Sequence, residues 1–195
     1  LQIATPSRGT IDTYGQLQAD VARLVSDVNG RHGEVDWTPI RYLNKGYSQT
    51  VLAGLYRTAR VGIVTPLQDG MNLVAKEYVA AQNPSDPGVL VLSKFAGAAN
   101  ELDTALLVNP NNIDGMARAV AAAFEMPLLE RRLRWESMMK KLRSATIEKW
   151  FADFIEALDT AHGASRGRDP SGPDSDPSPL WPVRVAASGH SARIH

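Results

Sequence analysis

The chain has 195 residues, its 21 Lys and Arg residues equal its 21 Asp and Glu residues in number, and it contains no cysteine. The balanced charge provides no global field that would attract nucleic acid or an anionic membrane. The lack of cysteine excludes disulfides, thiolate nucleophiles and cysteine-based metal sites, and it fits a cytoplasmic protein. No apolar run approaches the roughly 20 residues that cross a bilayer, so we expect neither a membrane nor a nucleic acid as partner.

Strands and helices alternate from the first residue onward. Residues 1–5 are a short apolar run typical of a strand, and apolar residues from Leu17 to Val28 recur at the spacing of one helix face. That helix is predicted to end at Gly30 and Gly33. The pattern then predicts strands over 38–44, 61–66, 88–93 and 105–110, with helices over 48–59 and 72–82 between them.

Strands separated by helices of ten or more residues pair in parallel, which predicts an α/β fold with a Rossmann-like, doubly wound sheet. The run VGIVTP (61–66) is nearly all apolar and is predicted to be buried on both faces. The remainder is helical. Residues 112–125 and 127–145 are predicted as two helices broken at Pro127, the second with a solvated basic face. Ile147, Trp150, Phe151, Phe154, Ile155 and Leu158 form an apolar stripe on a third helix.

Composition divides the chain into two parts. Residues 1–161 are predicted to be one Rossmann-like domain with C-terminal helices. It begins inside a strand and without Met, so we expect a fragment that is incomplete at its N-terminus. Residues 162–195 are rich in Pro, Ser, Gly and Asp and are predicted to be a disordered tail.

Ligands of open parallel sheets bind where strands end and helices begin. The segment that follows residues 61–66 is the richest such place. Asp69 and Gly70 are expected to form a tight turn in which Gly70 tolerates positive φ. The amides of Met71, Asn72 and Leu73 would then point outward at a helix N-terminus, ready for phosphate or sugar oxygens.

Glu77 lies eight residues beyond Asp69, roughly 12 Å along a helix. Carboxylates so spaced cannot share one proton, but they can hold two separate diols, such as the hexose and the ribose of a nucleotide sugar. The alternative is that Asp69 caps the helix and that Glu77 is an ordinary exposed residue, with Lys76 facing solvent.

Three further loops follow strand ends. The small residues of KFAGAANEL (94–102) allow close approach to a ligand, and Glu101 can cap a following helix or bind a hydroxyl, of which we expect the cap. Arg8 beside Gly9 suits phosphate recognition, although surface arginines are common. Tyr47 can stack on a base or cover the sheet edge.

Several classes of site are excluded. The histidines are His32, His162, His190 and His195, three of which lie at or beyond the border of the predicted tail. A His-dependent triad or a His metal cluster is therefore not expected in the folded part. The chain has neither a Walker P-loop nor GxGxxG after a strand, which excludes P-loop NTPases and dinucleotide dehydrogenases. We predict no metal and no cofactor.

The segments TPSRG, YLN, VGIVTPLQDGMNLVAKEYVAAQ and GVLVLSKFAGAANEL together resemble the trehalose-6-phosphate synthases, which are retaining glycosyltransferases of the GT-B fold. The resemblance covers residues 1 to about 160. It implies two facing Rossmann-like domains, of which this chain is the C-terminal, donor-binding one. It also implies transfer of glucose from UDP-glucose to glucose 6-phosphate, giving trehalose 6-phosphate and UDP.

By this resemblance Asp69 is the catalytic residue and holds the donor glucose and the diphosphate with the amides of Gly70 to Leu73, while Glu77 accepts the ribose hydroxyls. Residues that frame the uracil would be Ile3, Tyr47, Leu52 and Val74. Arg8 would reach the 6-phosphate of the acceptor. The last helix, with Trp150 and Phe154, would cross back onto the other domain.

The resemblance further implies retention without a protein nucleophile and without a metal. The family's diphosphate-clamping Arg and Lys and its acceptor domain have no counterpart in this chain, so we expect the isolated chain to bind donor weakly and to transfer no glucose. Alternatives are a non-catalytic nucleotide-sugar-binding or regulatory subunit, or a related retaining transferase with another acceptor. The residues do not decide the base of the donor nucleotide, so ADP-glucose and GDP-glucose stay open beside UDP-glucose. They also do not decide whether the chain forms a homo-oligomer.

Overall fold

The computed structural model describes residues 1–4 and 12–166. Leu1–Thr146 form one compact unit, and Ile147–His195 form a second. The first predicted loop, with Arg8, lies outside the described residues, as does the predicted tail from residue 167 onward. The last helix extends to Arg166, five residues past the predicted domain boundary at 161.

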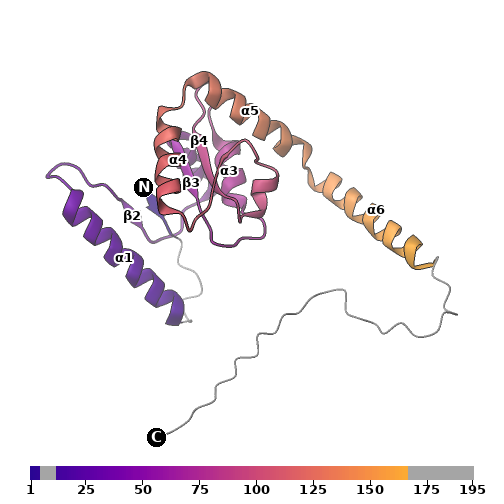
Figure 1. The fold of residues 1–195 in the computed structure, drawn as a ribbon, viewed down its shortest axis with the longest axis horizontal. Helices are drawn as coiled ribbons and strands as arrows, with labels where there is room; N and C mark the ends of the chain where they lie inside the picture. Colours follow the sequence, from indigo (N-terminus) through magenta and orange to yellow (C-terminus); the bar gives the residue numbers. More distant parts are fainter. Residues whose placement is uncertain (5–11, 167–195) are drawn as a thin grey trace, which may run out of the picture. The chain divides into compact units, whose positions relative to one another are not determined.

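The order of elements follows the predicted alternation (Figure 1). The strands are β1 (Gln2–Ile3), β2 (Tyr42–Leu43), β3 (Val61–Val64), β4 (Val89–Ser93) and β5 (Leu106–Val108). The helices are α1 (Asp12–His32), α2 (Gln49–Thr58), α3 (Leu73–Ala81), α4 (Ile113–Glu125), α5 (Leu128–Ser144) and α6 (Ile147–Arg166), with a short 3-10 helix η1 (Gly97–Asn100).

All strand pairs are parallel, as predicted, but the described strands form two sheets. One holds β1 and β2, and the other has the order β3-β4-β5. The strand predicted over 38–44 shrinks to Tyr42–Leu43. Its first part is held by α1 instead, because the side chain of Asn29 both donates to and accepts from the backbone of Ile40 at 2.9 Å.

Strand β4 is buried along its whole length and has a helical layer on each face. Leu90 and Leu92 pack into one core cluster with residues of α3 and α5. Val89 and Val91 pack into a second cluster with residues of α4. Successive side chains of a strand point to opposite faces, so this alternation places helices on both sides of the sheet. Figure 1 shows α3 and α4 flanking β3 and β4, which is the doubly wound arrangement that the sequence predicts.

The prediction that VGIVTP is buried on both faces is wrong. Among the described strands β3 pairs only with β4, and its Ile63 is 56% exposed. The other side of β3 is closely covered, because a Cβ at Gly62 would lie 2.7 Å from the ring of Tyr78. Double-sided burial belongs to the central strand β4, whose composition is equally apolar.

Helices α4 and α5 break at Pro127, as predicted, with Pro127 as the N-cap residue of α5. The basic run of α5 is not wholly a solvated face. Arg131 is 6% exposed and donates to the carboxylate of Asp86 and to the carbonyls of Pro87 and Met126. Its guanidinium holds the pKa of Asp86 below the usual range. The buried indole of Trp135 donates to the carbonyl of Val79 at 2.9 Å, which ties α5 to α3.

Helix α6 belongs to the second unit. Its Phe151, Phe154, Ile155 and Leu158 are 40–59% exposed and follow the spacing of one helix face, as the sequence predicts. The side chains of Ile147 and Trp150 are outside the description. Within residues 1–4 and 12–166, no helix combines the length and hydropathy that a membrane crossing requires.

Candidate functional site

The turn after β3 is closed by side-chain hydrogen bonds. Oδ1 of Asp69 accepts from the amide of Met71 at 3.1 Å, and Oδ2 accepts from Nδ2 of Asn72 at 2.9 Å. Asn72 in turn caps α3, because its Oδ1 accepts from the amide of Ala75 at 2.9 Å. The alternative in which Asp69 is the helix cap is therefore wrong. Asp69 instead accepts a hydrogen bond from Asn72, which is the cap residue.

Left-handed backbone occurs at Asn72 rather than at Gly70. Asn72 has φ 71°, and among the described residues it is the one non-glycine residue with positive φ. The φ of Gly70 is not positive. Gly70 contributes differently: a Cβ built on it would meet no atom within 4 Å, so its backbone borders open space. A ligand can approach the main chain closely at this point.

The N-terminus of α3 presents free donors. The amide of Met71 is taken by Asp69, so it is not free as the sequence suggests. In the described part of the chain, no acceptor is found for the amides of Leu73 and Val74. These groups lie at the positive end of a nine-residue helix, and such an end favours phosphate or sugar oxygens.

The loop after β4 lies directly against this turn. Asp69 forms a parallel bridge with Ala96, and the amides of Gly97 and Ala98 donate to the carbonyls of Asp69 and Met71 at 2.9 and 2.7 Å. A Cβ at Gly97 would lie 2.0 Å from the carbonyl oxygen of Gly70. The loop expected from KFAGAANEL thus contains a 3-10 turn whose small residues admit a neighbouring backbone.

An ion pair links α3 to the end of that loop. Nζ of Lys76 lies 2.7 and 2.8 Å from the two carboxylate oxygens of Glu101. The expectations that Lys76 faces solvent and that Glu101 caps a following helix are both wrong, since Glu101 is instead the C-cap residue of the preceding helix η1. The residues are 25 positions apart, so no local pattern reveals the pair.

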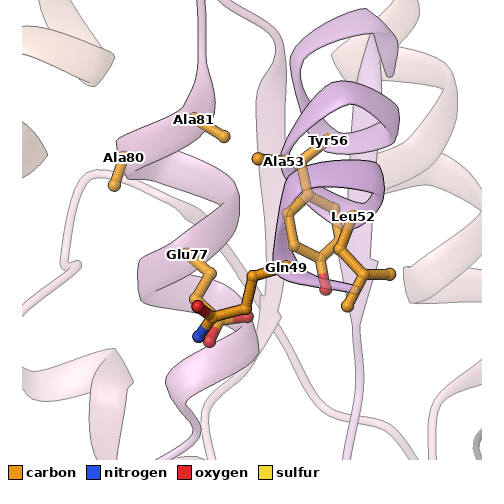
Figure 2. Close-up of a pocket in the computed structure, with 7 residues that line it drawn as sticks. All are labelled: Gln49, Leu52, Ala53, Tyr56, Glu77, Ala80 and Ala81. Carbon is orange, nitrogen blue, oxygen red and sulfur yellow. The ribbon is translucent and has the colours of Figure 1, made fainter. Parts of the chain in front are cut away.

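A pocket opens between α2 and α3, with a volume of about 330 Å³. Figure 2 shows Glu77 and Leu52 on its walls, together with Gln49 and Tyr56, which the sequence did not single out. Its remaining lining residues are Ala53, Ala80 and Ala81. Glu77 is exposed, as the alternative of an ordinary exposed residue supposed, but its exposed side chain lines the wall of a pocket.

The pocket combines an apolar surface with three polar groups. The amide of Gln49, the hydroxyl of Tyr56 and the carboxylate of Glu77 stand among alanine and leucine side chains. Burial, followed by the charge of Glu77, raises the pKa of Tyr56, so the phenol keeps its proton and remains a donor at neutral pH. An arrangement with few polar groups on an apolar wall is typical of small-molecule sites.

Other predicted residues are not brought into this pocket. Ile3 in β1 and Tyr47 after β2 are half-buried and are not among its lining residues, and Nζ of Lys45 lies 5.1 Å from the ring centroid of Tyr47. Val74 is 45% exposed at the start of α3. Arg8 belongs to residues that the structure does not describe. Where side chains are described, no three His, Cys, Asp or Glu residues gather as a metal site would need.

Residues 1–160 match the model of glycosyltransferase family 20. The chain belongs to glycosyltransferase family 20. This family 20 chain is 55% identical over 158 residues to a trehalose-6-phosphate synthase of Sinorhizobium fredii, covering 81% of the chain and 34% of the relative. It is 53% identical over 157 residues to the corresponding synthase of an Enterobacter species, covering 80% and 33%.

Solved structures give the same picture. A UDP-forming alpha,alpha-trehalose-phosphate synthase of Burkholderia xenovorans, in complex with glucose-6-phosphate, superposes with a TM-score of 0.78 at 54% identity, over 81% of this chain and 35% of that one. A structure from E. coli bound with UDP-2-fluoro glucose has a TM-score of 0.78 at 47% identity, over 80% and 35%. The fold class predicted from the sequence, a Rossmann-like domain of a GT-B transferase, is confirmed. The family 20 chain spans about a third of the length of the relatives it matches.

Proposed function

We propose that this chain is the donor-binding half of a retaining glycosyltransferase that moves glucose from UDP-glucose to glucose 6-phosphate, giving trehalose 6-phosphate and UDP. The observation that carries the proposal is the arrangement of α3. Free amides at its N-terminus adjoin the Asp69 turn, and Glu77 lines a pocket on the same helix. About half of the residues are identical to those of trehalose-6-phosphate synthases, which supports these substrates.

Spacing along α3 fits a nucleoside diphosphate. Leu73, with its free amide, and Glu77 are four residues apart, about 6 Å along the helix axis. A ribose in the pocket would donate its hydroxyls to Glu77, and the attached diphosphate would reach the amides of Leu73 and Val74. The glucose would then lie at the Asp69 turn, where Gly70 borders open space.

The base would lie beyond the ribose, against Leu52 and the exposed Val74, with Ile3 and Tyr47 completing its frame. Gln49 adds an amide that can pair with a base edge or a ribose oxygen. We propose uracil as the base, since the structure of the E. coli relative is bound with UDP-2-fluoro glucose. ADP and GDP in the same titration test this choice.

The chemistry we propose is positional. The acceptor hydroxyl attacks the anomeric carbon on the face that the diphosphate leaves, and a diphosphate oxygen takes its proton. Asp69 holds the turn that positions the sugar, and the α3 N-terminus stabilises charge on the departing diphosphate. Arg8 would pair with the phosphate of the acceptor, and the apolar stripe of α6 would pack on the acceptor half. We also propose a cytoplasmic location, because a cysteine-free chain needs no oxidising compartment.

Calorimetric titration of the chain with UDP and UDP-glucose tests the donor site. Glu77→Ala should weaken both ligands about tenfold or more, because both contain the ribose and hydrogen bonds to a charged group are among the stronger ones. Glu136→Ala, an exposed glutamate on α5, is the matched control and should bind as the wild type does. Equal affinity of Glu77→Ala and wild type would remove Glu77 from the site.

Transfer is measured separately. Incubation of the chain with UDP-glucose and glucose 6-phosphate should give no trehalose 6-phosphate, because the proposed half-site holds only the donor. Product from this polypeptide alone would contradict the half-site proposal. Two alternatives are that the longer protein uses another acceptor and that it is a regulatory subunit. In both cases the longer protein would bind the donor but would form no trehalose 6-phosphate.

A further inference from the structure

The ion pair between Lys76 and Glu101 lies beside the proposed donor site without lining its pocket. Lys76 directly precedes Glu77 on α3, and its ammonium contacts both oxygens of Glu101 at the end of the loop 95–101. Consecutive helix residues point in directions about 100° apart. Glu77 therefore faces the pocket against α2, whereas Lys76 faces the loop.

The start of this loop is already joined to the Asp69 turn. The amides of Gly97 and Ala98 bond to the carbonyls of Asp69 and Met71, and Gly97 admits the backbone of Gly70. The Lys76–Glu101 pair ties down the other end. The loop is thus held by the Asp69 turn at Gly97 and Ala98 and by α3 at Glu101.

Burial indicates that the pair acts on position more than on stability. The side chains of Lys76 and Glu101 are 23% and 39% exposed, and partly exposed ion pairs contribute little to folding. The chain is anchored independently at the next residue, Leu102, which is fully buried. What the pair does restrict is the placement of the loop relative to the N-terminus of α3.

We propose that Lys76 and Glu101 are positioning residues that hold the loop 95–101 against the Asp69 turn and so set the affinity for the sugar of the nucleotide sugar. This inference rests on the proposed function, because it requires that glucose lies at that turn. Neither residue contacts the ligand. The nucleoside diphosphate alone, which would bind along α3, depends little on the pair.

The test compares UDP-glucose with UDP in calorimetric titrations of the full chain. Lys76→Met and Glu101→Gln should each weaken UDP-glucose binding about threefold to tenfold, which lies at the lower end of the pairwise coupling between contacting side chains. UDP should change less than about twofold. The exchanged pair, Lys76→Glu with Glu101→Lys, should regain most of the lost affinity. Amides of Gly97 and Ala98 should exchange hydrogen faster in the single variants.

Lys141 and Asp103 provide a matched control, because they form an ion pair of 2.6 Å, 41% and 53% exposed, two residues beyond Glu101. Lys141→Met and Asp103→Asn should bind both ligands as the wild type does. Unchanged UDP-glucose affinity in the Lys76 and Glu101 variants would overturn the inference and leave the donor site standing. Equal losses for UDP and UDP-glucose, with no recovery on exchange, would mark a general structural role and also overturn it. A wild-type chain that binds neither ligand would overturn the donor site itself.

Discussion

The central region β3–β5, with α3, α4 and α5, contrasts with the N-terminal region β1–α1–β2. In the central region the strands bury Leu90, Val91 and Leu92 completely. In the N-terminal region α1 is as clearly patterned in sequence, yet Leu17 and Leu24 are 59% and 56% exposed. Amphipathic spacing indicates a helix in both regions, whereas burial of its apolar face depends on a second element.

Truncation of one leucine in each region would sharpen this contrast most. Leu92→Ala should lower the free energy of unfolding by about 3 kcal/mol, because it removes a fully buried side chain and leaves a cavity. Leu24→Ala should change it by less than about 0.5 kcal/mol. Urea unfolding followed by circular dichroism measures both. Similar losses in the two variants would show that α1 is packed in solution.

Arginine pairs provide the next comparison. Arg131→Met should cost about 2 kcal/mol, because it leaves the buried carbonyl of Pro87 without its donor. The guanidinium of Arg23 lies 3.8 Å from Asp20 on the exposed helix α1. Arg23→Met should therefore lower the free energy of unfolding by less than about 0.5 kcal/mol. The same unfolding measurement applies. An unchanged free energy of unfolding in Arg131→Met would mean that water replaces the guanidinium as donor to Pro87.

Replacing Gly97 or Gly30 by alanine should change the free energy of unfolding in opposite directions. Gly97→Ala forces a Cβ against the carbonyl of Gly70, so we expect a loss of about 1–3 kcal/mol and weaker UDP-glucose binding. Gly30→Ala in α1 meets no atom within 4 Å and should gain about 0.5 kcal/mol through helix propensity. Thermal unfolding and calorimetry follow the two effects. Unchanged sugar binding in Gly97→Ala would separate the loop from the site.

The smallest expected effect concerns pH. Hydrogen bonding and charge from Arg131 lower the pKa of Asp86 in the folded state. A lowered folded pKa stabilises the fold above the ordinary carboxyl value of 3.8, and this stabilisation is lost as the pH falls through the folded pKa. Asp86→Asn should therefore flatten the acid limb of a stability profile measured below pH ~4.5. Asp20→Asn, on exposed α1, is the control; an unaltered acid limb in Asp86→Asn would contradict the assignment.

Local patterns predicted much of what the structure contains. The alternation of elements, the break at Pro127 and the placing of Asp69 before α3 and Glu77 on it all follow from short-range rules. The DGMN segment contains two residues able to cap a helix, Asp69 and Asn72, and only their mutual hydrogen bond decides which of them does. The sequence alone could not resolve that choice.

Long-range neighbours account for the remaining differences. The exposure of β3 depends on which strands lie beside it, and the burial of Arg131 depends on a loop 44 or 45 residues away. The same holds for Lys76 and Glu101. For the candidate site, the sequence indicated Leu52 and Glu77 but not Gln49 and Tyr56, because packing of α2 against α3 creates the wall they share.

The hydrogen bond from Trp135 to Val79 makes α3 optically observable. The indole is 7% exposed and is bonded to a carbonyl only two residues from Glu77. Displacement of α3 by a bound nucleotide would change the environment of this fluorophore, whereas Trp37 is 56% exposed and already samples water. Because the chain contains four tryptophans, the difference in emission between the wild type and Trp135→Phe offers a label-free reading of events at the helix that carries the proposed donor site.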